Sequence, residues 1–226
     1  MAKSSKDSSP ISNVEQTLSN TEKYLEENYK VLLTGLGVIV AIVAIIWLGK
    51  LFQSRRNDEA QSQIYQAERY LEMDSLNLAL NGDGNYLGFV DIAKSYKRTK
   101  TGNLANYGAG ICYLHLGDYQ SAIDYLEKYS KSDKIIGSLA IGAIGDAHVE
   151  LGNLDKGVAE YIKAADYSKN SFNTPIFLMK AGEIYELLGK YNEALKVYER
   201  IESEYPTTTE GASIEKYIAR VKLLTK

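Results

Sequence analysis

The side chains that could act as catalytic acids, bases or metal ligands are few and scattered. Two histidines, His115 and His148, and one cysteine, Cys112, occur among 226 residues. Nucleophilic catalysis needs a base and an orienting group near the nucleophile, and no Ser/His/Asp set, paired catalytic carboxylates or phosphate-binding loop is present. A single cysteine also excludes an intramolecular disulfide and a cysteine-rich zinc site. The sequence therefore predicts no catalytic residue, no metal site, no cofactor and no small-molecule substrate.

Two short segments carry polar groups that could bind ions. The segment NGDGN at residues 81–85 lacks the alternating acidic residues and the bidentate glutamate of a calcium loop, so a plain turn is favoured. In KSYKRTK, Lys94, Lys97, Arg98 and Lys100 lie close together. Cations are common near helix carboxyl ends, which favours a solvated helix end. A contact with anionic lipid or an acidic partner is the alternative.

The overall charge balance is mildly acidic. The net charge is −3 and the pI is about 5.6. Nucleic-acid-binding domains usually carry a basic surface, so this balance argues against general nucleic-acid binding.

The chain begins with a Ser-rich polar segment. We expect residues 1–21 to be a disordered tail, because they have too few apolar side chains to bury.

An uncharged apolar run follows this tail. Val31 to Gly49 carries no charged residue and lies between Lys30 and Lys50. At about 1.5 Å per residue the run is about 28 Å long, close to the ~30 Å hydrocarbon core of a bilayer. We therefore predict that residues 22–50 form a helix leading into the membrane and a single transmembrane span. No cleavage site for a signal peptidase follows the run, so the span is expected to remain as an anchor.

Small residues recur on one face of this span, at steps of three and four: Thr34, Gly37, Ala41 and Ala44. Small residues let a partner helix approach closely in lipid, where association depends on packing. They are the candidate membrane-partner face. The alternative is that small residues are simply common in membrane spans.

Flanking charges bear on orientation. Lys23 and Lys30 precede the span, whereas four basic residues follow it: Lys50, Arg55, Arg56 and Arg69. Taken alone, the positive-inside rule places the large carboxy-terminal domain in the cytoplasm.

The carboxy-terminal part repeats one pattern three times, at LGDYQSAIDYLEKY, LGNLDKGVAEYIKA and LGKYNEALKVYERI. The pattern aligns on Gly117, Gly152 and Gly189. Seven residues before each lies another glycine, at Gly110, Gly145 and Gly182; small residues follow at Ala122, Gly157 and Ala194, and large residues at Leu126, Tyr161 and Tyr198. The central glycines suit a positive φ at a helix end, and the small residues let two antiparallel helices approach closely. Such hairpins bury their apolar faces by stacking.

This spacing resembles the tetratricopeptide repeat family, over residues 104–206. His148 occupies a ring position of its repeat, which favours packing over ligand binding. Thr174 and Pro175 predict the amino-terminal cap and first turn of the third unit. The resemblance implies an all-α fold, with a single transmembrane helix followed by a tetratricopeptide-repeat α-solenoid. Such a domain is expected to bind proteins and to have no enzymatic activity.

The flanking segments are predicted to be helical. Residues 51–103 should form juxtamembrane helices and a first helical pair, with one helix over residues 58–80 and its partner over residues 86–98. Residues 207–226 should form a capping helix, because one face carries an apolar stripe: Ile214, Tyr217, Ile218, Val221 and Leu224.

By the family pattern, the first helix of each hairpin lines an inner groove, which is the candidate protein-binding site. Its apolar members are Tyr107, Ile111, Leu114 and Met179, and its acidic members are Asp146, Glu150, Glu183 and Glu186. We expect the four carboxylates to form one acidic patch, in a groove without lysine or arginine. Such a groove suits extended apolar or basic segments. The alternative is that several of these side chains pack against the preceding unit.

The order of tail, span and repeats, with EKYLEENYKVLLTGLGVIVAIVAIIW as the membrane segment, is similar to the ancillary subunit family of the Sec translocon. That resemblance implies a bacterial inner-membrane protein with a periplasmic repeat domain, and partners that are the translocon or a membrane chaperone and unfolded envelope proteins. Because long domains can translocate despite flanking charge, this expectation overrides the charge count. A cytoplasm-facing adaptor that recruits a soluble partner is the alternative.

Overall fold

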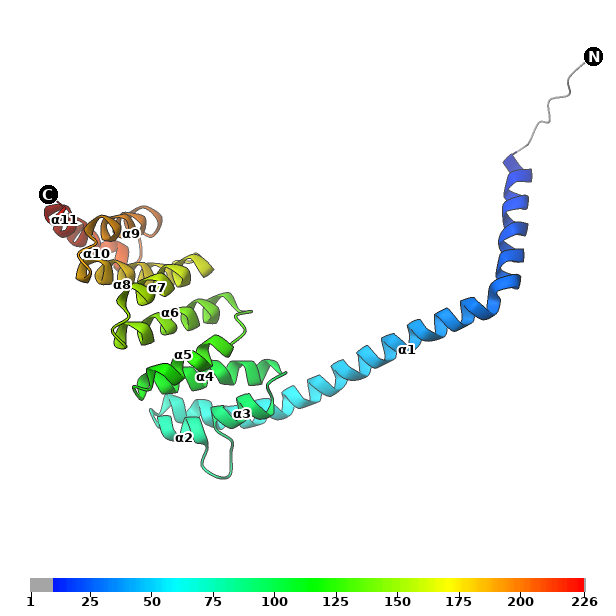
Figure 1. Cartoon of the computed structure of the whole chain (residues 1–226), viewed down its shortest axis with the longest axis horizontal. Coiled ribbons are helices and arrows are strands. Elements are labelled where there is room, and N and C mark those ends of the chain that lie inside the picture. Colours follow the sequence, from blue (N-terminus) through cyan, green and yellow to red (C-terminus); the bar gives the residue numbers. More distant parts are fainter. Residues whose placement is uncertain (1–9, 226) are drawn as a thin grey trace, which may run out of the picture. The chain divides into compact units, whose positions relative to one another are not determined.

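The computed structural model describes residues 10–225 of the chain (Figure 1). These residues form α-helices joined by turns, with no β-strand among them, which confirms the predicted all-α fold. The helices, in chain order, are α1 (Pro10–Glu72), α2 (Leu76–Asn81), α3 (Phe89–Ser95), α4 (Lys100–His115), α5 (Tyr119–Lys128), α6 (Lys134–Glu150), α7 (Leu154–Ser168), α8 (Thr174–Leu187), α9 (Tyr191–Glu204), α10 (Thr209–Ser213) and α11 (Glu215–Leu224). The chain divides into two compact units, Met1–Gln53 and Ser54–Lys226.

In the first unit, α1 carries the apolar run predicted to span a membrane. Its segment from Glu22 onward is long and apolar enough to cross a bilayer, with a mean hydropathy of 2.8 in its most apolar window. The large apolar side chains of this window are exposed on every face, including Ile45 at 70% and Trp47 at 63%. A helix that is apolar all round requires a covering of lipid or protein.

The start of α1 corrects the prediction of a disordered tail over residues 1–21. The helix begins at Pro10, so residues 10–21 are helical, while residues 1–9 lie outside the described residues. Proline is well suited to the first helical position because its fixed φ matches the helix. Extending an existing helix costs much less free energy than nucleating a new one. The polar residues 10–21 therefore continue the long helix that follows them in the sequence.

In the second unit, three helical hairpins follow one another: α4 with α5, α6 with α7, and α8 with α9 (Figure 1). The turns inside them are alike. Gly117, Gly152 and Gly189 have φ values of 80°, 77° and 68°, which confirms the expected left-handed conformation. In the first turn the Gly117 amide donates to the Leu114 carbonyl, and the Asp118 amide donates to the Tyr113 carbonyl. The same pair of bonds recurs in the other two turns and satisfies the last carbonyls of each first helix.

The upstream glycines are the places where the two helices of a hairpin touch. A Cβ at Gly145 would lie 2.8 Å from Cδ1 of Tyr161, and one at Gly182 would overlap the ring of Tyr198. At Gly110 the added carbon would meet the side chain of Leu126. The large residue of each second helix therefore occupies the space that the glycine leaves open, as the repeat spacing predicts.

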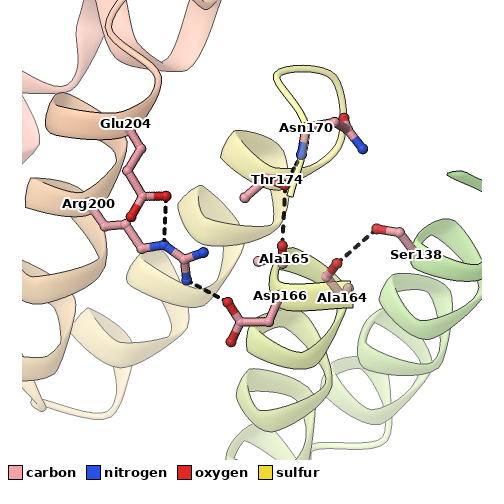
Figure 2. A network of polar contacts seen from close by, with 8 residues as sticks. All are labelled: Ser138, Ala164, Ala165, Asp166, Asn170, Thr174, Arg200 and Glu204. Carbon is pink, nitrogen blue, oxygen red and sulfur yellow. Dashed lines mark hydrogen bonds and ion pairs between the residues drawn. The ribbon is translucent and has the colours of Figure 1, made fainter. Parts of the chain in front are cut away.

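The third hairpin begins one residue earlier than predicted. The residue before α8 is Asn173, so Thr174 is the first helical residue rather than the cap, and Pro175 lies in the first turn. The Thr174 hydroxyl accepts from the Asn170 amide and donates to the Ala165 carbonyl at 3.2 Å, which ties α8 to α7 (Figure 2). Thr174 is fully buried, so this tie explains a polar residue at the junction.

Two further polar contacts lie near this junction, one within the second hairpin and one between the second and third (Figure 2). The Ser138 hydroxyl of α6 donates to the Ala164 carbonyl of α7 at 2.9 Å. Arg200 of α9 pairs with Asp166 of α7 at 2.8 Å and with Glu204 at 3.2 Å. The pair between Arg200 and Asp166 thus links the second helices of the last two hairpins.

The flank before the repeats differs from the prediction in two places. The expected helix over residues 58–80 is broken after Glu72, because Asp74 has a φ of 56°, and the chain restarts as α2 at Leu76. Asp is one of the few residues that adopts this conformation at low cost. The expected helix over residues 86–98 is shortened to α3.

At the other end, the capping segment forms two short helices, α10 and α11, instead of one. The predicted apolar stripe is confirmed in its centre, since Ile214, Ile218 and Val221 are buried against Tyr198 and Ile201. Leu224 is half exposed at 49%.

Candidate protein-interaction site

The eight predicted groove residues lie on the first helices of the three hairpins, α4, α6 and α8. Tyr107 borders a small pocket of about 130 Å³ in the repeat unit. The other lining residues are Glu68, Leu71, Phe89, Leu104 and Gly108. A cavity of about 150 Å³ holds benzene, so this slightly smaller apolar pocket has room for one aliphatic side chain. Burial raises the pKa of Glu68 at its rim, with a smaller contribution from Glu72.

Ile111 and Leu114 are only half exposed, because both pack against the buried cluster between α5 and α6. Tyr107 contributes to the same cluster, with its ring centroid 5.7 Å from that of Tyr129. These three side chains therefore pack against α5 of their own hairpin and α6 of the following one, and not against the preceding unit as the alternative had it.

Asp146 is ion-paired, which contradicts the expectation of a groove without lysine. Its Oδ1 accepts from the Lys180 ammonium of α8 at 2.6 Å and from the Tyr161 hydroxyl at 2.6 Å. Lys180 also lies over the Tyr161 ring, 5.5 Å from the centroid. Burial and the bond to Asp146 raise the pKa of Tyr161. This carboxylate therefore joins α6 to α8 and is already neutralised.

Glu186 is neutralised in a similar way by a residue outside the repeats. Arg220 of α11 binds it through two nitrogens, at 2.7 and 2.9 Å, and the Tyr198 hydroxyl donates to it at 2.7 Å. Only 14% of the Glu186 side chain is exposed. The bond to Glu186 is the main cause that raises the pKa of Arg220. The prediction of one acidic patch of four carboxylates is therefore wrong, because two of them hold the helices together.

Of the eight predicted groove residues, three remain available for contact with a partner: Glu150, Glu183 and Met179. Glu150 and Glu183 are exposed, and Glu150 accepts from the Tyr119 hydroxyl at 3.2 Å. Met179 is half-buried against the core of the last two hairpins.

The structure also explains the NGDGN segment as a turn. The Asp83 carboxylate accepts from the amides of Asn85 and Tyr86 and from the Tyr70 hydroxyl at 2.7 Å. These bonds lower the pKa of Asp83, chiefly through the Tyr86 amide. Among the side chains that the structure describes, no three His, Cys, Asp or Glu converge where they could hold a metal ion.

Comparison with known families assigns the hairpins. Three stretches match models described as tetratricopeptide repeats: residues 96–133, 140–171 and 177–208. The carboxy-terminal unit carries three tetratricopeptide repeats. No curated protein matches the chain. We call residues 54–226 the repeat domain.

Tetratricopeptide repeats mediate contacts between proteins, so the repeat domain is a protein-interaction scaffold. The first matched stretch contains α4 and α5, the second and third begin inside α6 and α8, and α10 and α11 lie after the last of them. The sequence did not predict the ion pairs of Asp146 and Glu186, and each omission has a specific reason. Lys180 follows Met179 directly in the sequence, but the family pattern assigns the groove by the residues at i, i+3 and i+4 of each first helix. Arg220 lies beyond the repeats, and nothing in the local sequence links it to Glu186.

Proposed function

We propose that the chain is a single-pass membrane protein whose repeat domain acts as a scaffold or chaperone for other proteins. The observation that carries this proposal is the combination of an uncovered apolar helix, long enough to cross a bilayer, with tetratricopeptide repeats. Burying one large aliphatic side chain stabilises by about 1.5–3 kcal/mol, so leaving the whole run in water is strongly unfavourable. A lipid bilayer supplies the missing apolar environment.

The more specific proposal is an ancillary subunit of the Sec translocon in the bacterial inner membrane, with the repeat domain in the periplasm. Support comes from the order of segments and from the resemblance of the membrane segment. The partners would be the translocon or a membrane chaperone, together with unfolded segments of envelope proteins. The basic residues after the span, including Arg55 and Arg69, support the rival proposal of a cytoplasm-facing adaptor.

Labelling of an introduced cysteine decides between these orientations. Cys112 is fully buried, and burial raises the pKa of its thiol to about 12, so the native thiol should stay unreactive at neutral pH. Thr225→Cys places an exposed thiol at the end of α11. In spheroplasts, a membrane-impermeant maleimide should label this variant before lysis.

The control is Ser5→Cys on the other side of the span, which should be labelled only after lysis. Labelling of Thr225→Cys only after lysis would exclude the periplasmic orientation and support the adaptor.

Client binding is proposed to use the pocket beside Tyr107. An apolar side chain of an extended segment would enter the pocket, while Glu150 and Glu183 offer exposed charge farther along the groove. Affinity should be weak, because an extended chain loses conformational freedom on binding. Leu104→Gln places a polar group in the pocket and should weaken binding of an unfolded apolar peptide by about tenfold.

Leu223→Gln is the matched control, because Leu223 is 71% exposed on α11 and far from the pocket lining. Fluorescence anisotropy of a labelled peptide measures both variants, after thermal melts show that both are folded. Equal weakening by the two substitutions would contradict binding at this pocket.

A further inference from the structure

A second hollow of about 450 Å³ lies between α3, α4 and α5 of the repeat domain. Three lysines line it, Lys94, Lys97 and Lys128. Asn106 and Tyr125 provide polar and aromatic walls, and Val90 lines it with apolar surface. We call this hollow the basic pocket. It shares no residue with the candidate groove or with the pocket beside Tyr107.

The three lysines have no carboxylate partner among the described residues, within the 4.0 Å that defines an ion pair. All three are exposed. Single lysines elsewhere in the described part of the domain also lack an ion pair, among them Lys134, Lys156 and Lys196, but the three around this hollow form a cluster. The chain as a whole has a net charge of −3, so a cluster of unpaired cations around one hollow departs from its general balance. Like charges repel one another, and an anion between them relieves this repulsion.

The Lys128 ammonium is positioned as well as exposed. It lies over the Tyr125 ring, 4.4 Å from the centroid. Such a contact holds a cation at a fixed place while leaving its remaining hydrogens free to donate. Lys94 and Lys97 come from α3 and the turn after it, so the pocket exists only once α3 packs against the first repeat.

The geometry points to a binding site for an acidic protein segment, in which an aspartate or glutamate carboxylate meets the lysines and an adjacent apolar side chain meets Val90. This site goes beyond the proposed function and does not depend on the orientation of the domain. A protein segment is favoured over a lipid surface because attraction to anionic lipid typically uses clusters of about four to eight basic residues, whereas three lysines line this hollow beside aromatic and apolar walls.

The test uses the full-length chain in nanodiscs of zwitterionic lipid. The probe is a short end-blocked peptide of Glu, Leu, Ser and Gly, and its twin has Gln in place of each Glu. The unmodified chain should bind the acidic peptide better than the twin, and added salt should weaken this binding because the site is open to solvent. The triple variant Lys94→Gln, Lys97→Gln and Lys128→Gln should lose about tenfold in affinity, since each exposed pair contributes modestly.

The control variant is Lys134→Gln, Lys156→Gln and Lys196→Gln, which changes the net charge equally at three exposed positions away from the pocket. It should bind the acidic peptide as the unmodified chain does, and that result supports the site. Equal loss in both variants, or equal binding of both peptides, overturns it. Co-sedimentation with phosphatidylglycerol vesicles that needs the three pocket lysines, without peptide binding, also overturns it and assigns the pocket to lipid.

Discussion

At the scale of single residues, the repeat domain depends on glycines that leave room for a large neighbour. Gly182 faces Tyr198, which is fully buried and donates a hydrogen bond to Glu186. The same space at Gly145 is filled by Tyr161, which binds Asp146. Each glycine therefore supports both the packing of a hairpin and the position of a tyrosine hydroxyl that holds a carboxylate.

Gly182→Leu should overpack the third hairpin. The new side chain would overlap the Tyr198 ring, and overpacking a core costs about 1–3 kcal/mol or more. Chemical denaturation of the chain measures the loss. Ala159→Leu is the control, because Ala159 is exposed on α7 and should change stability by no more than about 0.5 kcal/mol. An unchanged midpoint for Gly182→Leu would contradict the hairpin register.

At the scale of the elements, the predictable features are those set by local sequence. The turns at Gly117, Gly152 and Gly189 follow from the need for a positive φ, and the hairpin contacts follow from the spacing of small residues. The break at Asp74 was missed because no Gly or Pro marks it. The partners of Asp146 and Glu186 lie 34 positions away in the sequence. These ion pairs can therefore be recognised only once the helices are placed side by side.

The face of α1 proposed to meet a membrane partner, lined by Thr34, Gly37, Ala41 and Ala44, is exposed along its length. A Cβ at Gly37 would meet no other atom within 4 Å, so nothing in the first unit covers this face. Gly37→Leu with Ala41→Leu should abolish co-purification of a membrane partner while leaving insertion intact, because large side chains keep the two helices apart.

Gly35→Leu is the control for this element, since Gly35 is also uncovered but lies on a different face of the helix. It should leave co-purification unchanged. If the double variant still retains its partner, binding belongs to the repeat domain instead.

At the scale of the whole repeat domain, each hairpin packs mainly on its neighbours in the sequence. The core is divided into three buried clusters: one around α1 to α4, one between α5 and α6, and one from α6 to α11. In such quasi-one-dimensional domains, stability is close to a sum of repeat and interface contributions. A change that destabilises one end of the domain should therefore lower the stability of the nearest repeats most.

Removing residues 214–226 tests this expectation. The deletion uncovers Tyr198 and Ile201 and leaves Glu186 without Arg220, so a nearly buried carboxylate loses its charge partner. Amide hydrogen exchange should rise in α8 and α9, while α3 and α4, whose cluster contains none of the deleted residues, should keep their protection. Deleting only residues 224–226, of which Leu224 and Thr225 are exposed, should leave exchange unchanged throughout. A uniform rise from α3 to α9 after the longer deletion would instead mean that the domain unfolds as one cooperative unit.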